Sequence, residues 1–241
     1  MNLALDFGNT RIKAAVFNGS QLDQTCVFDS EDDLLQGLGR FRGLKKCIIG
    51  SVTNAHQKAS QHLSEQLSTL VFKADTPIPL KNLYKSALTL GSDRLAGSMG
   101  AYSLYPNRAV LTIDAGTCIK YNFVNAANEY LGGAISPGLP MRLKAMHHYT
   151  HALPEVAMDS SYHRLVGQST QESLLSGALV GAAAEVDGMI DRYNTTYEGV
   201  QVVLTGGDAP YLAAQLKNRF FTDPNLVLRG LNAILEFNSE K

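Results

Sequence analysis

The chain repeats one short pattern, an apolar strand followed by Asp-x-Gly, a threonine and a lysine. The pattern reads LALDFGNTRIK from Leu3 to Lys13 and LTIDAGTCIK from Leu111 to Lys120. With a one-residue gap, the matching pairs are Asp6 and Asp114, Gly8 and Gly116, Thr10 and Thr117, Ile12 and Ile119, and Lys13 and Lys120. Each copy continues into further predicted strands, at 22–28 and 130–135. This repeat of strand, turn and strand predicts a duplicated domain.

The turn of the first copy suits phosphate binding. Gly8 and Asn9 tolerate positive φ, so backbone N–H groups of the turn can point at an anion with no side chain in the way. Lys13 adds a positive charge, and the Asp6 carboxylate can hold Mg²⁺ or its water. Taken alone, the same stretch also fits a plain β-hairpin with an acidic corner. The second copy favours two phosphate loops that face one cleft.

The composition describes a globular chain that can bury a core. Of its 241 residues, 45% are hydrophobic and 18% are charged, and the net charge is −1. Such a chain, without a basic tail, is not expected to bind nucleic acid. The three cysteines lie far apart in apolar strands, so they are expected to be reduced. We find neither a signal peptide nor an apolar stretch near the ~20 residues of a membrane span, which predicts a cytoplasmic protein without membrane contact.

Strand and helix signals alternate through the first half of the chain. They predict three strands, a helix that begins with a capping box, a buried strand at 47–52 and a helix from Gln57 to Leu70. This order indicates an α/β fold, with helices packed on a mixed sheet. Pro106-Asn107 is the natural boundary before a new sheet begins. The predicted domains are therefore 1–107 and 108–241.

The second half carries a long helical stretch, from Gln168 to Tyr193. Its small residues lie along one side, where another backbone can come close: Gly177, Gly181, Ala184 and Gly188. Close packing inside the domain and a dimer interface both fit this side, and the polar Glu185 and Asp187 argue against a membrane span.

A Gly-Gly turn follows the predicted strand at 200–204. Gly206 and Gly207 open a helix that Asp208 caps. Without side chains, such a turn lets a flat nucleotide ring lie against the backbone. The turn therefore predicts the adenosine side of a nucleotide site.

One carboxylate stands where a kinase needs a base. Asp93 begins a predicted helix within Gly-Ser-Asp-Arg, residues 91–94, and the helix dipole would keep it ionised. Arg94 offers a fork that can take a substrate carboxylate in two hydrogen bonds. The alternative is that Asp93 is only an N-terminal helix charge that pairs with Arg94.

Six motifs follow one another along most of the chain. They are Asp-x-Gly-Asn-Thr with Lys13, Gly-x-Asp-Arg at 91–94, Asp-x-Gly-Thr at 114–117, Gly-Gly-x-Ile-x-Pro-Gly at 132–138, Leu153-Pro154 and Gly167-x-x-Thr170. In this order and spacing, the chain resembles the type III pantothenate kinases, members of the acetate and sugar kinase/Hsc70/actin superfamily. The resemblance implies a homodimer of duplicated actin-like (ribonuclease H-like) half-domains, with helices on both faces of a mixed sheet. It also implies ATP-dependent phosphorylation of pantothenate to 4′-phosphopantothenate, the first step of coenzyme A biosynthesis.

The resemblance implies roles for single residues. The ATP site comprises Asp6, Gly8, Asn9, Thr10, Arg11, Lys13 and Thr117. Asp93 accepts the proton of the pantothenate hydroxyl, and the substrate pocket is lined by Tyr84, Gly91, Ser92 and Arg94. Thr170 contacts the substrate from the partner subunit. Asp114 helps to bind a monovalent cation, K⁺ or NH₄⁺, which is used alongside Mg²⁺.

The chain departs from the family pattern in two places. After the second Asp-x-Gly-Thr the family carries a Thr and then an Asp, where this chain has Lys120 and Asn122. This departure raises the hypothesis that the Lys120 ammonium substitutes for the monovalent ion. In the loop after Tyr84, Ser86 and Ala87 stand where the family often has Asn-Pro.

Two other functions fit parts of the sequence. A sugar or acetate kinase shares the fold, but 241 residues leave little room for a sugar-binding insertion. A nucleotide-binding regulator without catalysis is the second, since family members have been described as transcriptional accessory factors. In such a regulator we expect the phosphate loop or the catalytic base to be altered, whereas Asp6, Lys13 and Asp93 are all present in this chain.

Overall fold

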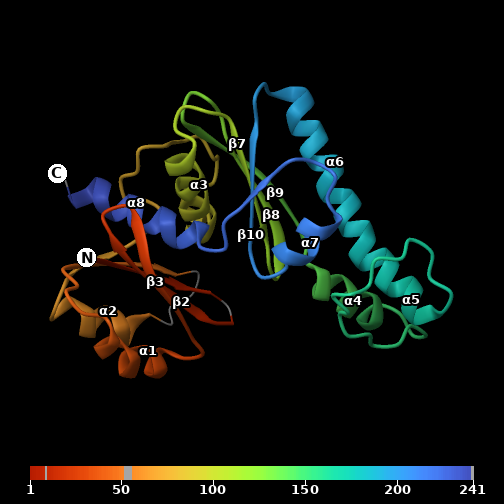
Figure 1. Cartoon of the computed structure of the whole chain (residues 1–241), viewed down its shortest axis with the longest axis horizontal. Coiled ribbons are helices and arrows are strands. Elements are labelled where there is room, and N and C mark those ends of the chain that lie inside the picture. The colour runs from red at the N-terminus through yellow and green to blue at the C-terminus, as the bar shows by residue number, and fades with distance from the viewer. Residues whose placement is uncertain (9, 52–55, 240–241) are drawn as a thin grey trace. The chain divides into compact units, whose positions relative to one another are not determined.

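The computed structural model describes residues 1–8, 10–51 and 56–239. The chain forms two compact units, and Figure 1 labels many of their helices and strands. Unit 1 consists of Met1–Asn107, Val124–Leu131 and Asn225–Lys241, and unit 2 consists of Arg108–Phe123 and Gly132–Pro224. Each unit is built from segments that are far apart in the chain. The two halves expected from the repeat, 1–107 and 108–241, stay a prediction.

Unit 1 is built on a five-stranded mixed sheet. The strand order is β3 (Gln21–Phe28), β2 (Ile12–Asn18), β1 (Asn2–Phe7), β4 (Lys46–Ser51) and β5 (Ser68–Val71). β2 pairs antiparallel with β1 and β3, whereas β4 runs parallel to β1 and β5. The carboxyl ends of β1 and β4 therefore lie side by side, with Asp6 opposite Gly50 and Phe7 opposite Ser51.

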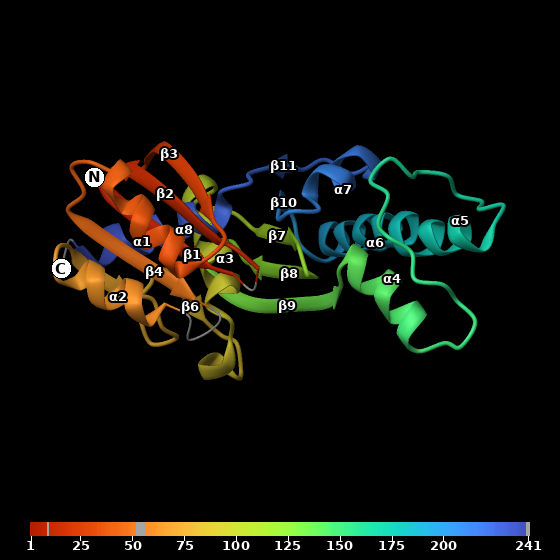
Figure 2. The ribbon, with the colours of Figure 1, turned by 90° about the horizontal axis from the view of Figure 1, so that it is seen from below.

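Helices cover both faces of this sheet, as the sequence predicts. They are α1 (Glu31–Gly37), α2 (Gln57–Ser64), α3 (Ser92–Leu104) and α8 (Leu226–Ser239). Alternation along β1 sends Leu3 and Leu5 into the core under α1 and α2, and Ala4 into the core under α3 and α8. Figure 2 shows α1 and α2 on one side of the sheet and α8 on the other.

Glycines let α3 and α8 approach each other backbone to backbone. A Cβ on Gly230 of α8 would stand 1.7 Å from the carbonyl oxygen of Ala96, and one on Gly100 would stand 2.1 Å from that of Leu226. Larger residues at either position would push the helices apart. Farther along α8, Asn232 accepts a hydrogen bond of 2.9 Å from Asn2, which joins this helix to β1.

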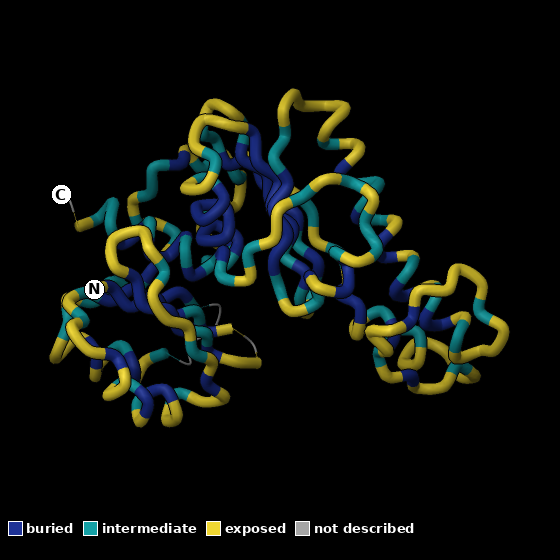
Figure 3. Tube along the Cα trace, viewed as in Figure 1, coloured by how far each residue is buried: buried dark blue, intermediate teal, exposed yellow. Residues whose placement is uncertain are grey.

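The second sheet supplies the core of unit 2. Its strand order is β11 (Phe221–Thr222), β10 (Gln201–Thr205), β7 (Val110–Ala115), β8 (Cys118–Val124), β9 (Glu129–Pro137) and β6 (Lys81–Asn82). β9 begins in unit 1, where it pairs with β6, and continues in unit 2. The helices of unit 2 are α4 (Leu139–His148), α5 (Thr170–Leu175), α6 (Gly181–Thr196) and α7 (Ala209–Gln215). Figure 3 shows the central strands buried and many of the connections exposed.

The helix Thr170–Thr196, which includes α5, a π-helical turn at Ser176–Val180 and α6, is long and apolar enough to cross a membrane by length and composition alone. The expectation that no stretch approaches that length is wrong by this measure. Helices in the cores of soluble proteins pass the same test, and 44% of the most apolar 18-residue window is buried. Leu179, Val186 and Ile190 pack into the core of unit 2, which is the arrangement of a core helix.

The small-residue side of this helix faces away from the core. Gly177, Gly181 and Ala184 are exposed. Among the described residues, no atom beyond the chain neighbours and the nearby backbone of the same helix lies within 4 Å of where a Cβ would stand on Gly177 or Gly188. Of the two alternatives for this side, close packing inside the domain is therefore not seen for Gly177 or Gly188 among the residues that the structure describes.

Glu185 of α6 is the centre of a polar network in unit 2. Its carboxylate accepts hydrogen bonds from Ser136 Oγ (2.6 Å), Tyr121 OH (3.2 Å) and an Arg142 guanidinium nitrogen (2.5 Å). Burial acts to raise the pKa of Glu185, but the hydrogen bonds from Ser136 and Arg142 and the Arg142 charge outweigh it, so the pKa lies below its usual value. Burial, and then the Glu185 charge, raises the pKa of Tyr121, which keeps the phenol protonated as a donor.

We expect Glu185→Gln to destabilise unit 2 in a pH-dependent way. Because the folded pKa of Glu185 is depressed, its contribution is present above the unfolded pKa, about 4.3, and is lost as the pH falls through the folded value. The difference in free energy of unfolding between wild type and variant should therefore shrink as urea titrations move from pH 7 into the acid range. Glu198→Gln, at an exposed carboxylate of unit 2, is the matched control. A difference that stays constant with pH would contradict the assignment.

One predicted helix is too long. The stretch expected to be helical from Gln57 to Leu70 is α2 only as far as Ser64, and Ser68–Val71 is β5. β5 pairs in parallel with β4, with Thr69 opposite Cys47. The β-branched Thr69 and Val71 suit a strand, and this long-range pairing overrides the helical spacing of the leucines.

Candidate active site

The first loop joins β1 to β2 at one end of the unit 1 sheet. The Gly8 N–H donates to the Arg11 carbonyl oxygen at 3.1 Å, which closes the turn. Asp6 and Lys13 are half-buried and lie directly opposite each other on the two strands, so their side chains leave the same face of the sheet. Thr10 is exposed. Asn9, which the sequence also assigns to this loop, lies outside the described residues.

Arg11 lies on the outer side of this loop. Its Nε stands 3.4 Å from Asp29 Oδ1, and the two side chains are 65% and 83% exposed. An ion pair so exposed contributes little to stability, so Arg11 can exchange this partner for another anion.

The start of α3 is fixed next to the same end of the sheet. Ser92 Oγ donates to the carbonyl oxygen of Ser51 at 2.8 Å, and Ser51 lies opposite Phe7 of β1. Since α3 packs on the face from which Asp6 and Lys13 project, these two residues and Asp93 are grouped at one end of unit 1. The sequence offered only a weak signal for Ser51, a Gly-Ser pair after an apolar strand.

Asp93 stands in the first turn of α3, after the N-cap residue Gly91. Asp93 Oδ1 accepts a hydrogen bond of 2.9 Å from the Arg94 backbone N–H. A Cβ on Gly91 would stand 2.5 Å from the same carboxylate oxygen, so glycine leaves the carboxylate its space.

The predicted substrate-side residues of unit 1 come together around Arg94. The Arg94 residue is only 7% exposed, and its guanidinium carbon lies 5.4 Å from the centre of the Tyr84 ring, a cation–π contact. Tyr84 packs in turn on Tyr130, with ring centres 6.1 Å apart. A guanidinium held against an aromatic ring keeps a fixed direction, which suits recognition of one carboxylate.

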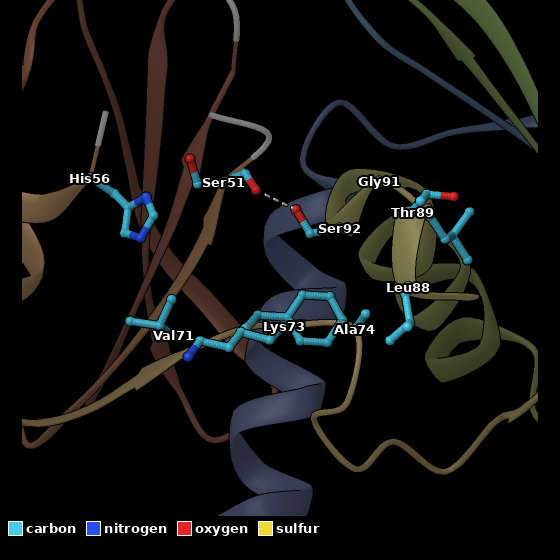
Figure 4. Close-up of a pocket in the computed structure, with 11 residues that line it drawn as sticks. Ser51, His56, Val71, Lys73, Ala74, Leu88, Thr89, Gly91 and Ser92 are labelled. Atoms are coloured by element: carbon cyan, nitrogen blue, oxygen red, sulfur yellow. Dashed lines mark hydrogen bonds between the residues drawn. The ribbon is translucent and has the colours of Figure 1, made fainter. Parts of the chain in front are cut away.

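A cavity of about 590 Å³ lies beside Gly91 and Ser92 in unit 1. Figure 4 shows Ser51 and His56 on one side of it, Gly91, Ser92 and Leu88 on another, and the Val71–Ala74 segment below. Its full lining is Ser51, His56, Val71, Phe72, Lys73, Ala74, Leu88, Thr89, Leu90, Gly91 and Ser92. The sequence motifs did not point to His56 or Lys73, since neither lies in a recognisable pattern.

The second loop joins β7 to β8 in unit 2 and repeats the geometry of the first. The Gly116 N–H donates to the Cys118 carbonyl oxygen at 3.1 Å, and the Gly138 N–H donates to that of Thr117 at 3.1 Å. A Cβ on Gly138 would stand 2.2 Å from the Gly116 carbonyl oxygen. Thr117, at the tip of the loop, is exposed and can meet a ligand.

The Gly-Gly turn packs directly on this second loop. Gly206 has a φ of +99°, and a Cβ there would stand 2.2 Å from the Ala115 carbonyl oxygen. The Asp208 N–H donates to the same oxygen at 2.8 Å. Within unit 2, the structure therefore groups the turn expected on the adenosine side with the second phosphate loop.

Asp114, the residue predicted for a cation site, forms an ion pair in unit 2. Lys120 Nζ lies 3.0 Å from Asp114 Oδ2, and the two side chains are 24% and 23% exposed. Asp114 stands at the carboxyl end of β7, opposite Thr205 of β10.

Thr170 is the first residue of α5 in unit 2. Ser169 caps this helix, its Oγ accepting from the Glu172 N–H at 3.2 Å. Gly167 lies close to the helix backbone, since a Cβ there would stand 2.3 Å from Ser173 N. The cap leaves Thr170 exposed. Its contact with a substrate held by a second subunit stays a prediction.

Known proteins similar to the chain agree on one family. A family model described as type III pantothenate kinase matches residues 2–192. A curated protein of Christiangramia forsetii with that name is 42% identical over 241 residues, which cover 99% of each chain. A Flavobacterium johnsoniae protein with the same name is 38% identical and covers 98% of each chain. The chain belongs to the type III pantothenate kinase family.

Several solved structures share the fold of the chain over most of its length. A Campylobacter jejuni protein described as a Baf family transcriptional activator is 21% identical, with a TM-score of 0.62 and coverage of 99% of this chain and 100% of that one. The ROK hexokinase of Thermus thermophilus is 17% identical, with a TM-score of 0.56 and coverage of 98% and 99%. At these identities the likeness shows the fold alone. The predicted α/β fold with actin-like half-domains is confirmed.

Proposed function

We propose that this type III pantothenate kinase family member transfers the γ-phosphoryl group of ATP to the primary hydroxyl of pantothenate. The product is 4′-phosphopantothenate, and the reaction is the first step of coenzyme A biosynthesis. The observation that carries the proposal is the grouping of Asp6, Lys13 and Asp93 at one end of unit 1, in a chain 42% identical over its length to a type III pantothenate kinase.

In the proposed reaction, Asp93 accepts the proton of the pantothenate hydroxyl. The hydroxyl oxygen then forms the new bond to the γ-phosphorus, the bond between this phosphorus and the β–γ bridging oxygen breaks, and ADP leaves. The backbone N–H of Arg94 holds one oxygen of the Asp93 carboxylate, which orients the other. Buried Arg94 faces the pantothenate carboxylate, in a pocket with Tyr84, Gly91 and Ser92. Thr170 closes the pocket from a second subunit.

The two loops hold the nucleotide in this proposal. Gly8, Thr10, Arg11 and Lys13, together with Asn9, bind phosphate oxygens, and Thr117 binds ATP from the second loop. Mg²⁺ fits beside Asp6, because a half-buried carboxylate at a strand end supplies the hard oxygen donor that this ion requires. When bound, Mg²⁺ neutralises phosphate charge. The same proposal includes a single positive charge beside Asp114. This charge is either a free K⁺ or NH₄⁺ ion or the ammonium group of Lys120.

A homodimer in the cytoplasm completes the proposal. The exposed small residues Gly177, Gly181 and Ala184 support it, because they offer a smooth helix side on which a second copy can pack closely. The odd number of cysteines, none of them disulfide-bonded among the described residues, is typical of reducing compartments.

An ADP-release assay coupled to a reporter tests the function. With ATP and Mg²⁺ present, we expect ADP release only when pantothenate is added. The control omits pantothenate, which measures the background hydrolysis of ATP. No pantothenate-dependent release from a protein that still binds ATP would favour the nucleotide-binding regulator instead.

A further inference from the structure

We propose that the Lys120 ammonium is a built-in monovalent cation at the second loop, so that the chain needs no free K⁺ or NH₄⁺. The inference rests on the proposed kinase function. The resemblance to the type III pantothenate kinases implies a free monovalent ion beside Asp114. Lys120 Nζ already lies 3.0 Å from Asp114 Oδ2. A free monovalent ion therefore does not fit this loop as it is built.

The Asp114–Lys120 pair differs from the exposed ion pairs of the chain. Its side chains are 24% and 23% exposed, whereas those of Lys58 and Asp32 are each 69% exposed, and their atoms are 3.4 Å apart. A pair withdrawn from water is screened less by solvent and salt than a surface pair. Lys120 is therefore held at Asp114 more firmly than a lysine on an open surface.

The position of the pair explains what its positive charge can do. Asp114 is the penultimate residue of β7, and the loop that follows the strand carries Gly116 and exposed Thr117. Gly206 of the Gly-Gly turn packs on Ala115, the residue next to Asp114. The ammonium thus lies at the base of the loop proposed to hold phosphate oxygens. A fixed positive charge there offsets the repulsion between these oxygens.

Charge balance argues against a second cation at the same place. The charges of the Asp114 carboxylate and the Lys120 ammonium sum to zero, and Asn122, which is buried two residues farther along β8, is neutral. A K⁺ ion sharing Asp114 would meet the like charge of Lys120 at short range. An ammonium carries the same charge as K⁺ and likewise attracts oxygen ligands, but its stem ties it to β8.

The test compares wild type with Lys120→Ala in the ADP-release assay, in K⁺-free buffer and with KCl, NH₄Cl or choline chloride added. We expect wild type to turn over equally well in every buffer. The turnover of Lys120→Ala should fall about 10²- to 10³-fold without K⁺, the usual effect of removing one group that stabilises developing charge. It should recover with K⁺ or NH₄⁺ but not with choline. Lys120→Met removes the charge but keeps most of the side-chain volume, so it separates loss of the ammonium from a folding defect. Lys217→Ala, at an exposed lysine of unit 2, is the matched control.

A second readout needs no turnover. With a non-hydrolysable ATP analogue bound, K⁺ should raise the melting temperature of Lys120→Ala but not that of wild type. Absence of pantothenate-dependent turnover in every buffer would refute the proposed function. The change in melting temperature with K⁺ would still test whether Lys120 takes the place of the ion. Full dependence of wild type on K⁺, or a folded Lys120 variant that K⁺ does not affect, overturns the inference.

Discussion

Asp93→Asn should lower kcat for pantothenate phosphorylation by about 10²- to 10⁴-fold, the usual range for loss of a general base. The amide keeps an oxygen that can accept the hydrogen bond Asp93 receives from the Arg94 N–H. The start of α3, and with it Arg94, should therefore stay in place, and KM for pantothenate should change little. Steady-state kinetics of the purified variant measure both quantities.

The control for this prediction is Asp32→Asn. Asp32 is also an acidic residue in the first turn of a helix, α1, but it lies outside the proposed site. If Asp93 were only a helix N-terminal charge, the two variants would both lose a little stability and both keep their turnover. Equal kcat for Asp93→Asn and wild type would remove Asp93 from the mechanism.

Gly100→Ala should destabilise unit 1 by about 3 kcal/mol or more, at the upper end of the cost of overpacking a core. The new Cβ would stand 2.1 Å from the Leu226 carbonyl oxygen, and a backbone atom cannot move aside as a side chain can. α3 and α8 would have to separate. Urea unfolding followed by circular dichroism should show a lower midpoint, and catalysis should weaken because α3 carries Asp93.

Gly97→Ala is the matched control, since it makes the same change on the same helix. Apart from the nearby backbone of its own helix, a Cβ there would meet only Val227 Cγ2 among the described residues, at an ordinary 3.8 Å. Alanine is the better helix former by about 1 kcal/mol, so this variant should be as stable as wild type or more so. Equal destabilisation by the two substitutions would show that the loss comes from α3 itself and not from its contact with α8.

The sequence predicted those features that neighbouring residues determine. Each loop follows an apolar strand that ends in Asp-x-Gly, and the residue types of the turn are enough to indicate it. Asp93 was also found locally, because a carboxylate after a glycine marks the start of a helix. Lys120 and Asp114 lie on two strands linked by a short turn, so the sequence could raise the hypothesis that the Lys120 ammonium substitutes for the monovalent ion.

Features that depend on distant parts of the chain were missed. Nothing near Gln57 shows that the strand partner of Ser68–Val71 is β4, so the predicted helix ran too far. The hydrogen bond between Ser92 and Ser51 joins residues 41 positions apart. The contact of Gly230 with Ala96 depends on how two helices cross, which hydrophobic spacing does not encode.

The contact of α8 with α3 and β1 has a consequence for the synthesis of the protein. The ribosome makes all of unit 2 before it makes α8, yet the sheet of unit 1 needs α8 to cover one face. While unit 2 is being translated, Ala4, Ile48 and Met99 are therefore only partly buried, and this exposed apolar surface can bind chaperones or aggregate. The helix that carries the proposed base therefore reaches its final packing only after all of unit 2 has been made.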